Sequence, residues 1–333
     1  MKKTNKFNSA VFKNFSESLG AVRNQKGIAL LMVLFAIVLL VTLVIEFNYQ
    51  SRIEFKSTLR FVNSEKAVFL ARSGLIAGEE ILRSNLTGNY DGLDQFWAKP
   101  FPPYPVGEGT VSVNIVDESG KIDINLLSLG KASRSAGEAQ IRKLFSLLEL
   151  EDNEVDEIIL WMACENDLYY QGLNPSYTCQ KNHALETLSE LRLVRGMTDE
   201  IYAKVSPFLT VYPQNPSPNN PINVNTADPM VLQTITYKDD KGGNYIFDLS
   251  KSMAEDLQNS RPLKMITDFD NIPSFKSATK LRTLSQQIAF KSIYFTISSL
   301  GEVEGTQRKM LETIFRPSGA GNTKINRNFT RLE

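Results

Sequence analysis

An uncharged apolar run dominates the hydrophobic pattern of this chain. It extends from Gly27 to Ile45, 19 residues without a charged side chain. At about 1.5 Å of rise per residue, a helix of this length crosses the roughly 30 Å hydrocarbon core of a bilayer. Lys and Arg outnumber acids in the residues before the run, whereas Glu46 follows it directly. This asymmetry predicts a single membrane-spanning helix with a cytoplasmic N-terminus and the bulk of the chain outside.

The apolar pattern continues beyond this run as one stripe. The stripe consists of Phe55, Leu59, Val62, Phe69 and Ile76. Its spacings of four, three, seven and seven residues are those of one helix face. No Pro or Gly occurs between Ile28 and Ser73. The sequence therefore favours one long helix over a separate helix that follows a break.

Period-two alternation predicts the strands. Residues 109–116 alternate apolar and polar side chains, and residues 292–299 and 310–315 do so on either side of a turn at Glu304-Gly305. Prolines interleaved with aromatic residues precede the first strand, which indicates a long connecting loop. Residues 317–333 are rich in Gly, Asn, Thr and Arg, so we expect a disordered tail.

Helical patterns fill the chain between the first strand and the last two. The segment 122–125 (IDIN) is echoed by 222–225 (INVN), and each segment opens a helical region. This repeat predicts two helical lobes, joined by the Pro- and Asn-rich linker 213–221. Residues 191–205 have the pattern of a helix-hairpin-helix unit, with Gly196 in its turn.

Charge and chemistry narrow the functional classes. The first 26 residues hold six bases and one acid, so the remainder carries 31 bases against 36 acids, a net charge of about −5. An acidic body and a turn with one glycine oppose DNA binding by the helix-hairpin-helix unit, and a packing module is favoured. The single histidine, His183, and the absence of hydrolase, zinc-protease or phosphate-loop motifs indicate that the chain is not an enzyme.

Two cysteines, Cys164 and Cys179, occur in the part that lies outside the membrane. In an exported chain they suggest one disulfide, and two unpaired buried thiols are the alternative. Closing a loop of this size stabilises a fold by about 3 kcal/mol in the chain-entropy model.

Two pairs of acids are candidate calcium ligands. They are Asp117 with Glu118, and Glu165 with Asp167. Carboxylate oxygens are the ligands that Ca²⁺ prefers. Neither pair has the spacing of a recognised calcium loop, so solvated turns are the favoured interpretation.

The junction of Lys26 and Gly27 allows three interpretations of the apolar run. A cleaved secretory signal has a core of roughly 7–15 residues and a small-residue site after it, and this run is longer and lacks that site. A plain uncleaved anchor explains the length and charge but not the glycine. A type IV prepilin-like signal is cleaved before the apolar helix, between Gly27 and Ile28, and the later sequence decides in its favour.

Five segments together resemble the K-type minor pseudopilin of the type II (general) secretion pathway. They are Gly27 before the apolar helix and residues 117–125 (DESGKIDIN), 169–177 (YYQGLNPSY), 189–197 (SELRLVRGM) and 222–227 (INVNTA). The likeness covers roughly residues 27–315, and SELRLVRG is its most specific part. The resemblance also implies bound calcium. Family members tend to have Trp-Ile-Asp followed by further acids where this chain has WMACEND, residues 161–167, so this chain departs from the family pattern there.

The resemblance implies an α+β, pilin-like fold: a long N-terminal helix packed on a small antiparallel sheet, with a large helical insertion containing helix-hairpin-helix-like units. It implies a non-enzymatic subunit that caps a periplasmic pseudopilus with I- and J-type minor pseudopilins, after processing by prepilin peptidase and N-terminal methylation, in a machine that exports folded proteins. The expected location is the bacterial inner membrane, with the bulk of the chain periplasmic. A membrane-anchored, exterior DNA-binding protein of a competence-like system is the alternative.

These expectations give a domain plan. It comprises a leader (1–27), a membrane helix (28–45), a pilin-like helix, loop and first strand (46–121), the insertion (122–288), a terminal hairpin (289–316) and the tail (317–333). Met32 is the fifth residue after the expected cleavage, where pilin-like subunits typically carry Glu. Its side chain lacks the carboxylate that pairs with a neighbour's N-terminal amine, so the resemblance assigns this chain to the tip.

We predict that Gly27→Leu leaves the precursor unprocessed, because a prepilin peptidase needs a small residue directly before the bond it cuts. Gly27→Ala, the matched control, retains part of the processing. N-terminal sequencing of the mature protein should begin at Ile28. A mature chain that begins after Ile45 would show that the run is a secretory signal instead.

Overall fold

The computed structural model describes residues 9–84, 88–163, 184–218, 220–238, 245–247, 249–275, 287–316 and 326–332. Side chains are described within these ranges except at 9–26, 237–238, 245–246 and 326–332. Contacts divide the chain into two compact units, residues 1–65 and residues 66–333.

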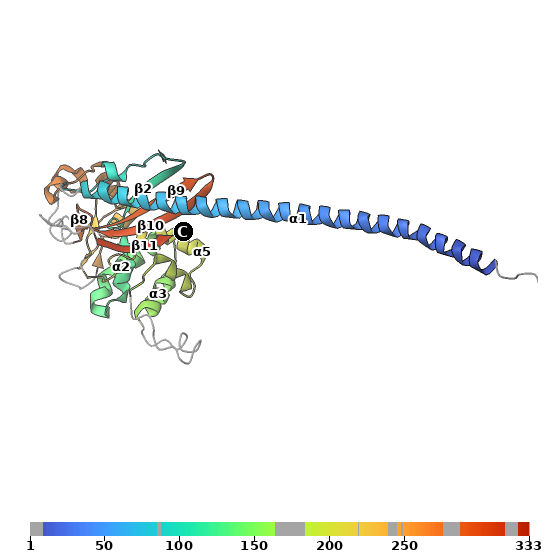
Figure 1. Cartoon of the computed structure of the whole chain (residues 1–333). Coiled ribbons are helices and arrows are strands. Elements are labelled where there is room, and N and C mark those ends of the chain that lie inside the picture. Colours follow the sequence, from blue (N-terminus) through green and yellow to red (C-terminus); the bar gives the residue numbers. More distant parts are fainter. Residues whose placement is uncertain are drawn as a thin grey trace, which may run out of the picture. The chain divides into compact units, whose positions relative to one another are not determined.

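Helix α1 (Ser9–Ser84) is unbroken (Figure 1), which confirms the predicted continuity. Its part from Gly27 onward is long and apolar enough to cross a membrane, the one such helix among the described residues. Every side chain from Gly27 to Val62 is exposed. An apolar helix surface left uncovered to this extent fits a single-pass membrane anchor.

A five-stranded antiparallel sheet forms the β part of the second unit. Its strands are β1 (Tyr104–Val106), β2 (Gly109–Asp117), β9 (Tyr294–Val303), β10 (Thr306–Phe315) and β11 (Asn326–Leu332), in the order β1-β2-β9-β10-β11. The predicted strands and the turn between β9 and β10 are confirmed. Glu304 and Gly305 take φ values of 48° and 73° there, the positive region typical of a tight hairpin turn. Strand β1 and the short helix η1 (Phe96–Ala98) lie within the predicted loop.

The prediction of a disordered tail was wrong for residues 326–332, which form β11 and pair with β10 from Met310 to Phe315. A polar sequence can form such a strand because backbone N–H and C=O groups make the ladder. Strand β10 offers these groups along its free edge. Side-chain alternation, the signal that predicts strands from sequence, is weak at an edge.

Helix α1 packs on the sheet through small residues. Ala67 and Ala71 are fully buried, and a Cβ atom built on Gly301 of β9 would lie 2.1 Å from the Ala67 carbonyl oxygen. A Cβ atom on Gly74 would lie 2.1 Å from Ser299 Oγ. Backbone therefore approaches backbone, and the core between them includes Leu75, Leu82, Trp97, Ile115, Phe295 and Ile297.

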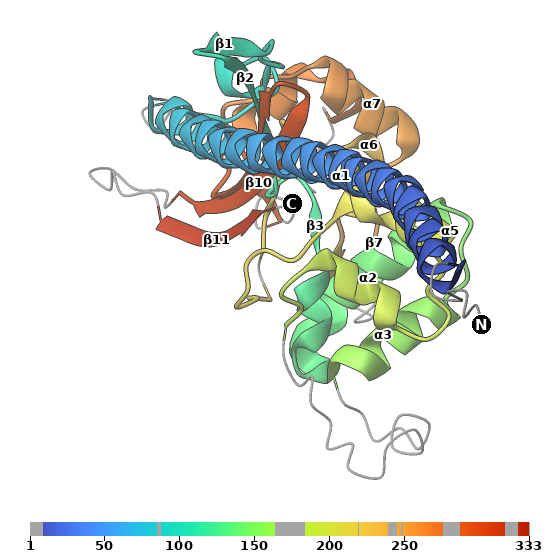
Figure 2. The same cartoon turned by 45° about the vertical axis from the view of Figure 1, so that its right-hand side comes forward.

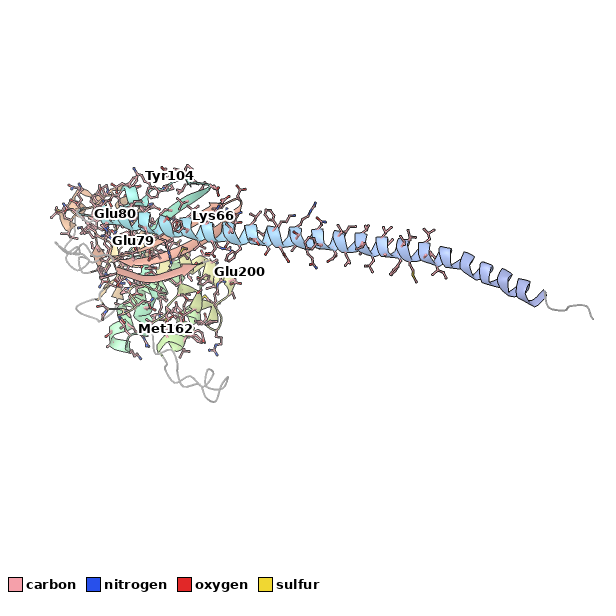
Figure 3. The ribbon with its side chains drawn as sticks, in the orientation of Figure 1. Lys66, Glu79, Glu80, Tyr104, Met162 and Glu200 are labelled. Carbon is pink, nitrogen blue, oxygen red and sulfur yellow. The ribbon has the colours of Figure 1, made fainter. Side chains whose placement is uncertain are left out.

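One ion pair fastens the start of this contact. Lys66 Nζ of α1 lies 2.5 Å from Glu108 Oε2 in the turn that joins β1 to β2. Figure 3 labels Lys66 on the helix and Tyr104 on β1. Both side chains of the pair are about half exposed or more, so solvent screens the charges and the pair contributes little to stability.

The insertion consists of helices and two-residue strands (Figure 2), and its buried apolar side chains form one core cluster. Its first half contains β3 (Ile122–Asp123), η2 (Ile124–Ser128), α2 (Lys131–Leu147), α3 (Asn153–Ala163), η3 (Leu188–Leu193), α5 (Asp199–Val205), η4 (Ser206–Phe208) and β4 (Leu209–Thr210). Its second half contains β5 (Ile222–Asn223), α6 (Pro229–Leu232), β6 (Tyr237–Lys238), β7 (Tyr245–Ile246), α7 (Lys251–Asn259), η5 (Ile266–Asn271), η6 (Pro273–Phe275) and β8 (Ile288–Ala289). The sequence also predicts a last helix of the insertion near residues 277–286, and this segment lies outside the described residues.

The two halves repeat one local structure, as the sequence echo predicts. Strand β3 pairs in parallel with β4, and β5 pairs in parallel with β8. The Asn125 side chain bonds both backbone groups of Leu185, at 2.7 and 3.1 Å, and Asn225 bonds both of Leu263, each at 2.7 Å. Apolar residues of both halves belong to a single core cluster, so the two predicted lobes share their interior.

Equivalent carboxylates then start the next helix in each half. Glu190 accepts bonds from the backbone N–H groups of Glu186 and Thr187, and Asp268 accepts them from Lys264 and Met265. The helix-hairpin-helix expected at 191–205 is modified, because its first helix, η3, is a 3₁₀ helix. Gly196 makes the turn with a φ of 83°, which favours glycine.

We predict that Gly301→Ala destabilises the second unit by about 1–3 kcal/mol, since the new methyl group would force α1 away from β9. Gly130→Ala is the matched control, because nothing lies within 4 Å of a Cβ atom there. Chemical denaturation followed by circular dichroism measures both. Equal loss in the two variants would contradict the close approach of helix and sheet.

Candidate functional site

A buried polar junction lies where the insertion leaves the sheet after β2 and returns to it before β9. Its members are Asp91, Asp117, Asn223, Ser292 and Arg316, none more than 7% exposed. They come from five segments that are far apart in the sequence: the loop after α1, the end of β2, β5, the chain before β9 and the end of β10. The junction thus joins the sheet to the insertion within the second unit.

Asp91 and Arg316 form a buried ion pair at the centre of the junction. Arg316 Nη2 also donates to the Ser292 carbonyl at 3.0 Å, and the guanidinium lies 4.6 Å from the Phe295 ring centroid. The Ser292 N–H donates to Asp91 Oδ2 at 2.8 Å. Both charges are desolvated, so loss of either partner would leave an unpaired buried charge, at a cost of about 3–5 kcal/mol.

Asp117 accepts bonds from both sides of the junction. Its Oδ1 accepts from the Ser119 N–H at 2.8 Å, and its Oδ2 accepts from Ser292 Oγ at 2.5 Å and from Thr226 Oγ1. Burial raises the pKa of Asp117 from 3.8 to about 6, although these bonds lower it and the Asp91 charge raises it. The carboxylate remains ionised above that pH because its donors are already in place.

Asn223 carries the second half of the insertion into the junction. Its Nδ2 lies 2.6 Å from Ser292 Oγ and 3.0 Å from the Asp91 carbonyl oxygen, and its N–H donates to the Ser119 carbonyl at 2.9 Å. Ser119 Oγ in turn accepts from the backbone N–H groups of Ile293 and Tyr294. These hydrogen bonds, made by amide, hydroxyl and backbone groups, attach β5 to the sheet through uncharged groups.

Asp123 occupies the position in the first half that Asn223 occupies in the second. Both side chains accept a bond from the N–H two residues later, at 2.9 and 3.0 Å. Asp123 is buried, and among the described residues its other oxygen accepts only from Asn220 Nδ2, at 3.3 Å. Burial raises the pKa of Asp123 from 3.8 to about 8, against the lowering effect of these two bonds. The first half therefore holds a carboxyl where the second half holds a neutral amide.

The expected calcium ligands have protein partners. Asp117 faces the junction, whereas Glu118 pairs with Lys121 at 3.1 Å and accepts from Thr210 Oγ1 at 2.8 Å. Within the described ranges, no three His, Cys, Asp or Glu residues lie close enough together to hold a metal ion. Glu165 and Asp167 lie outside the described residues.

Of the other residues singled out from the sequence, some are described in the structure and some lie outside the described residues. Gly27 has open space around it, and Ile28 and Met32 are exposed on α1, at 54% and 68%. Cys164 and Cys179 lie outside the described residues. Gly27, Ile28 and Met32 belong to the first unit and are not members of the junction, which belongs to the second.

In the alternative interpretation the helix-hairpin-helix unit would contact DNA. Both arginines of this unit form ion pairs with acidic residues of the chain. Arg195 pairs with Glu157, and Arg192 Nη1 lies 3.5 Å from Asp199 Oδ1 with its guanidinium 4.4 Å from the Tyr202 ring centroid. The hairpin therefore presents paired charges, as expected of a packing module.

Sequence reasoning missed the junction. Of its members, Asn223 stands in the repeated INVN segment and Asp117 was considered as a metal ligand. Asp91, Ser292 and Arg316 are single polar residues in loops or at strand ends, and their separation along the chain gives no periodic signal.

We predict that Asp123→Asn reduces the loss of stability with rising pH. Because the carboxyl has a higher pKa folded than unfolded, the native state binds more protons between pH 3.8 and about 8, so stability falls as pH rises through that window. Between about pH 5 and pH 8 the variant should gain at least about 1.4 kcal/mol relative to the unsubstituted chain, the equivalent of one pKa unit. Urea unfolding at several pH values measures this, and exposed Asp270→Asn is the control. A difference between variant and parent that is independent of pH would contradict the assignment.

Comparison with known proteins adds sequence and fold relationships. Residues 120–214 match the family model of type II secretion system protein K. Type II secretion system protein K of Aeromonas hydrophila is 26% identical over 321 residues, covering 88% of this chain and 93% of the relative. The protein K of Pseudomonas aeruginosa is 23% identical, covering 91% and 92%.

A solved structure shows the same fold. A chain from the crystal structure of the GspK–GspI–GspJ complex of the enterotoxigenic Escherichia coli type 2 secretion system superposes with a TM-score of 0.62 and 20% identity. The match covers 86% of this chain and 99% of that one. The pilin-like fold, with its long helix, antiparallel sheet and helical insertion, is confirmed. The resemblance is confirmed as well: this chain is similar to protein K of type II secretion systems in sequence over most of its length, and to a chain of the GspK–GspI–GspJ complex in fold.

Proposed function

We propose that this chain forms the tip of the type II secretion pseudopilus and thereby helps to export folded proteins across the outer membrane. The observation that carries the proposal is Met32. It lies in the uncharged run from Gly27 to Ile45, and it would be the fifth residue of the chain that cleavage after Gly27 leaves. A lone carboxylate at this depth costs roughly 2.5–3.5 kcal/mol, which pairing with a neighbour's amine would offset.

Without that carboxylate, a subunit has no partner for the amine of a subunit already present above it. It can still be the first subunit, and others can be added below it. The proposed order of assembly therefore begins with this chain.

The bulk of the insertion supports the same position. Residues 122–288 add a second core to the pilin-like fold. A subunit within a filament shaft has neighbours above and below, whereas a cap has none above it. The buried junction attaches this added mass to the sheet.

The proposed partners are the I- and J-type minor pseudopilins, because the solved structure similar to this chain belongs to a complex of K, I and J proteins. Prepilin peptidase is the proposed processing enzyme, with the cut between Gly27 and Ile28. The helix after the cut anchors the chain in the inner membrane, and residues from about 46 onward lie in the periplasm. We assign no catalytic role to the chain and retain the domain plan set out from the sequence, except that residues 326–332 of the tail form β11.

Residues from about 48 onward should form a 1:1:1 complex with the soluble parts of the I- and J-type partners. Size-exclusion chromatography with light scattering measures the mass of the mixture. Separate elution of the three proteins at micromolar concentration would contradict the proposed partnership.

Secretion should survive Met32→Leu, because an apolar side chain there makes the same contacts with lipid. Met32→Lys is the control that shows whether the assay detects a charge at this depth. Export of a secreted enzyme, normalised to the level of this chain, is the measurement. Loss of export in Met32→Leu at normal protein level, or labelled chains along filament shafts, would overturn the tip assignment.

A further inference from the structure

A pocket of about 330 Å³ opens beside the buried junction. Its polar lining comes from Asn89, Ser119, Asn220, Lys264 and Lys291, and Phe290 contributes the largest apolar side chain. The lining thus belongs to the loop after α1, the turn after β2, the linker before β5, the start of η5 and the chain before β9. The elements that the junction holds in place also fix this pocket.

The pocket is positively charged. Lys264 and Lys291 line it, and none of its lining residues is acidic. Within the described part of the chain, neither ammonium group has a carboxylate partner at ion-pair distance; Lys264 Nζ lies 5.7 Å from the Tyr90 ring centroid. Two cationic side chains in the lining of one hollow that has no acidic lining residue favour an anionic ligand.

Neutral donors remain available in the same hollow. Ser119 Oγ accepts from the N–H groups of Ile293 and Tyr294, at 3.1 and 3.2 Å, and its hydroxyl proton has no acceptor among the described residues. Asn220 Nδ2 donates one N–H to Asp123, and its other N–H has no acceptor in the described part of the chain. An anion in the pocket would therefore receive directional bonds as well as charge.

An apolar wall completes the lining. Pro221, Ala289, Phe290 and Ile293 form it, and Phe290 is held by an edge-to-face contact with Phe269, with ring centroids 6.3 Å apart. A free inorganic ion would leave these apolar side chains exposed to water. A carboxylate attached to an apolar group satisfies the lysines and the wall together.

We propose that this pocket binds the C-terminal carboxylate of a peptide whose last side chain is apolar. The carboxylate lies between Lys264 and Lys291 and accepts from Ser119, and the side chain packs on Phe290. This site is separate from the tip role, so either proposal can fail alone.

N-acetylphenylalanine is the probe, with N-acetylphenylalaninamide and inorganic phosphate as matched comparisons, and the protein is the full chain in detergent. Calorimetry measures binding, and lysine acylation followed by mass spectrometry measures protection of individual lysines. The acid should bind saturably and protect Lys264 and Lys291 but not exposed Lys251. Lys264→Gln combined with Lys291→Gln should weaken binding about tenfold or more, whereas Lys251→Gln should not change it.

Three outcomes overturn the proposal. They are no saturable binding of the acid, equal binding of the amide, and binding of phosphate as tight as that of the acid with protection of the same two lysines. Phe290→Ala provides an independent check, because it should weaken the acid and leave the weak binding of phosphate unchanged. Equal binding of the acid by Phe290→Ala and the parent would exclude the apolar wall from recognition.

Discussion

Desolvation of charge at the junction is the constraint on which the rest of the second unit depends. Asp91, Asp117 and Arg316 are buried, and buried charges are tolerated only when partners surround them. Their partners come from five segments, so no segment can satisfy its own charge. The sheet and the insertion are therefore stable together and costly apart, which favours one cooperative unit. The pocket beside the junction inherits this rigidity.

The contact between α1 and the sheet follows a different principle. It is almost free of charge and is made by Ala67, Ala71, Gly74 and Gly301. Small side chains allow the helix backbone to approach the strands closely, and larger residues on either side of the seam fill the core. The exposed apolar residues of the first unit have no described protein cover, which is consistent with a helix surrounded by lipid and by other subunits.

The two halves of the insertion share one local structure and differ at one residue of it. In both halves an Asn side chain bonds a distant backbone like a neighbouring strand, and in both an acidic residue starts the next helix. The position before that Asn differs. Asn223 extends into the junction as a neutral donor, whereas Asp123 is buried with a raised pKa. The same scaffold thus anchors one half to the sheet, and in the other half it holds a buried carboxyl group.

The sequence by itself determined the features that have a short period or a local composition. The membrane helix, its continuation as α1, the strands β2, β9 and β10 and the repeat of IDIN by INVN all follow from residues near one another, as does the family resemblance. Strand β11 could not be predicted, because its pairing depends on the free edge of β10 and not on its own side chains. The junction and the lysine pocket were decided only by the tertiary structure, since Asp91, Ser292 and Arg316 meet across more than two hundred residues. Hydrogen bonds and charge pairs of this kind leave no periodic trace along a chain; they form only when the chain on both sides of the insertion comes together at the sheet.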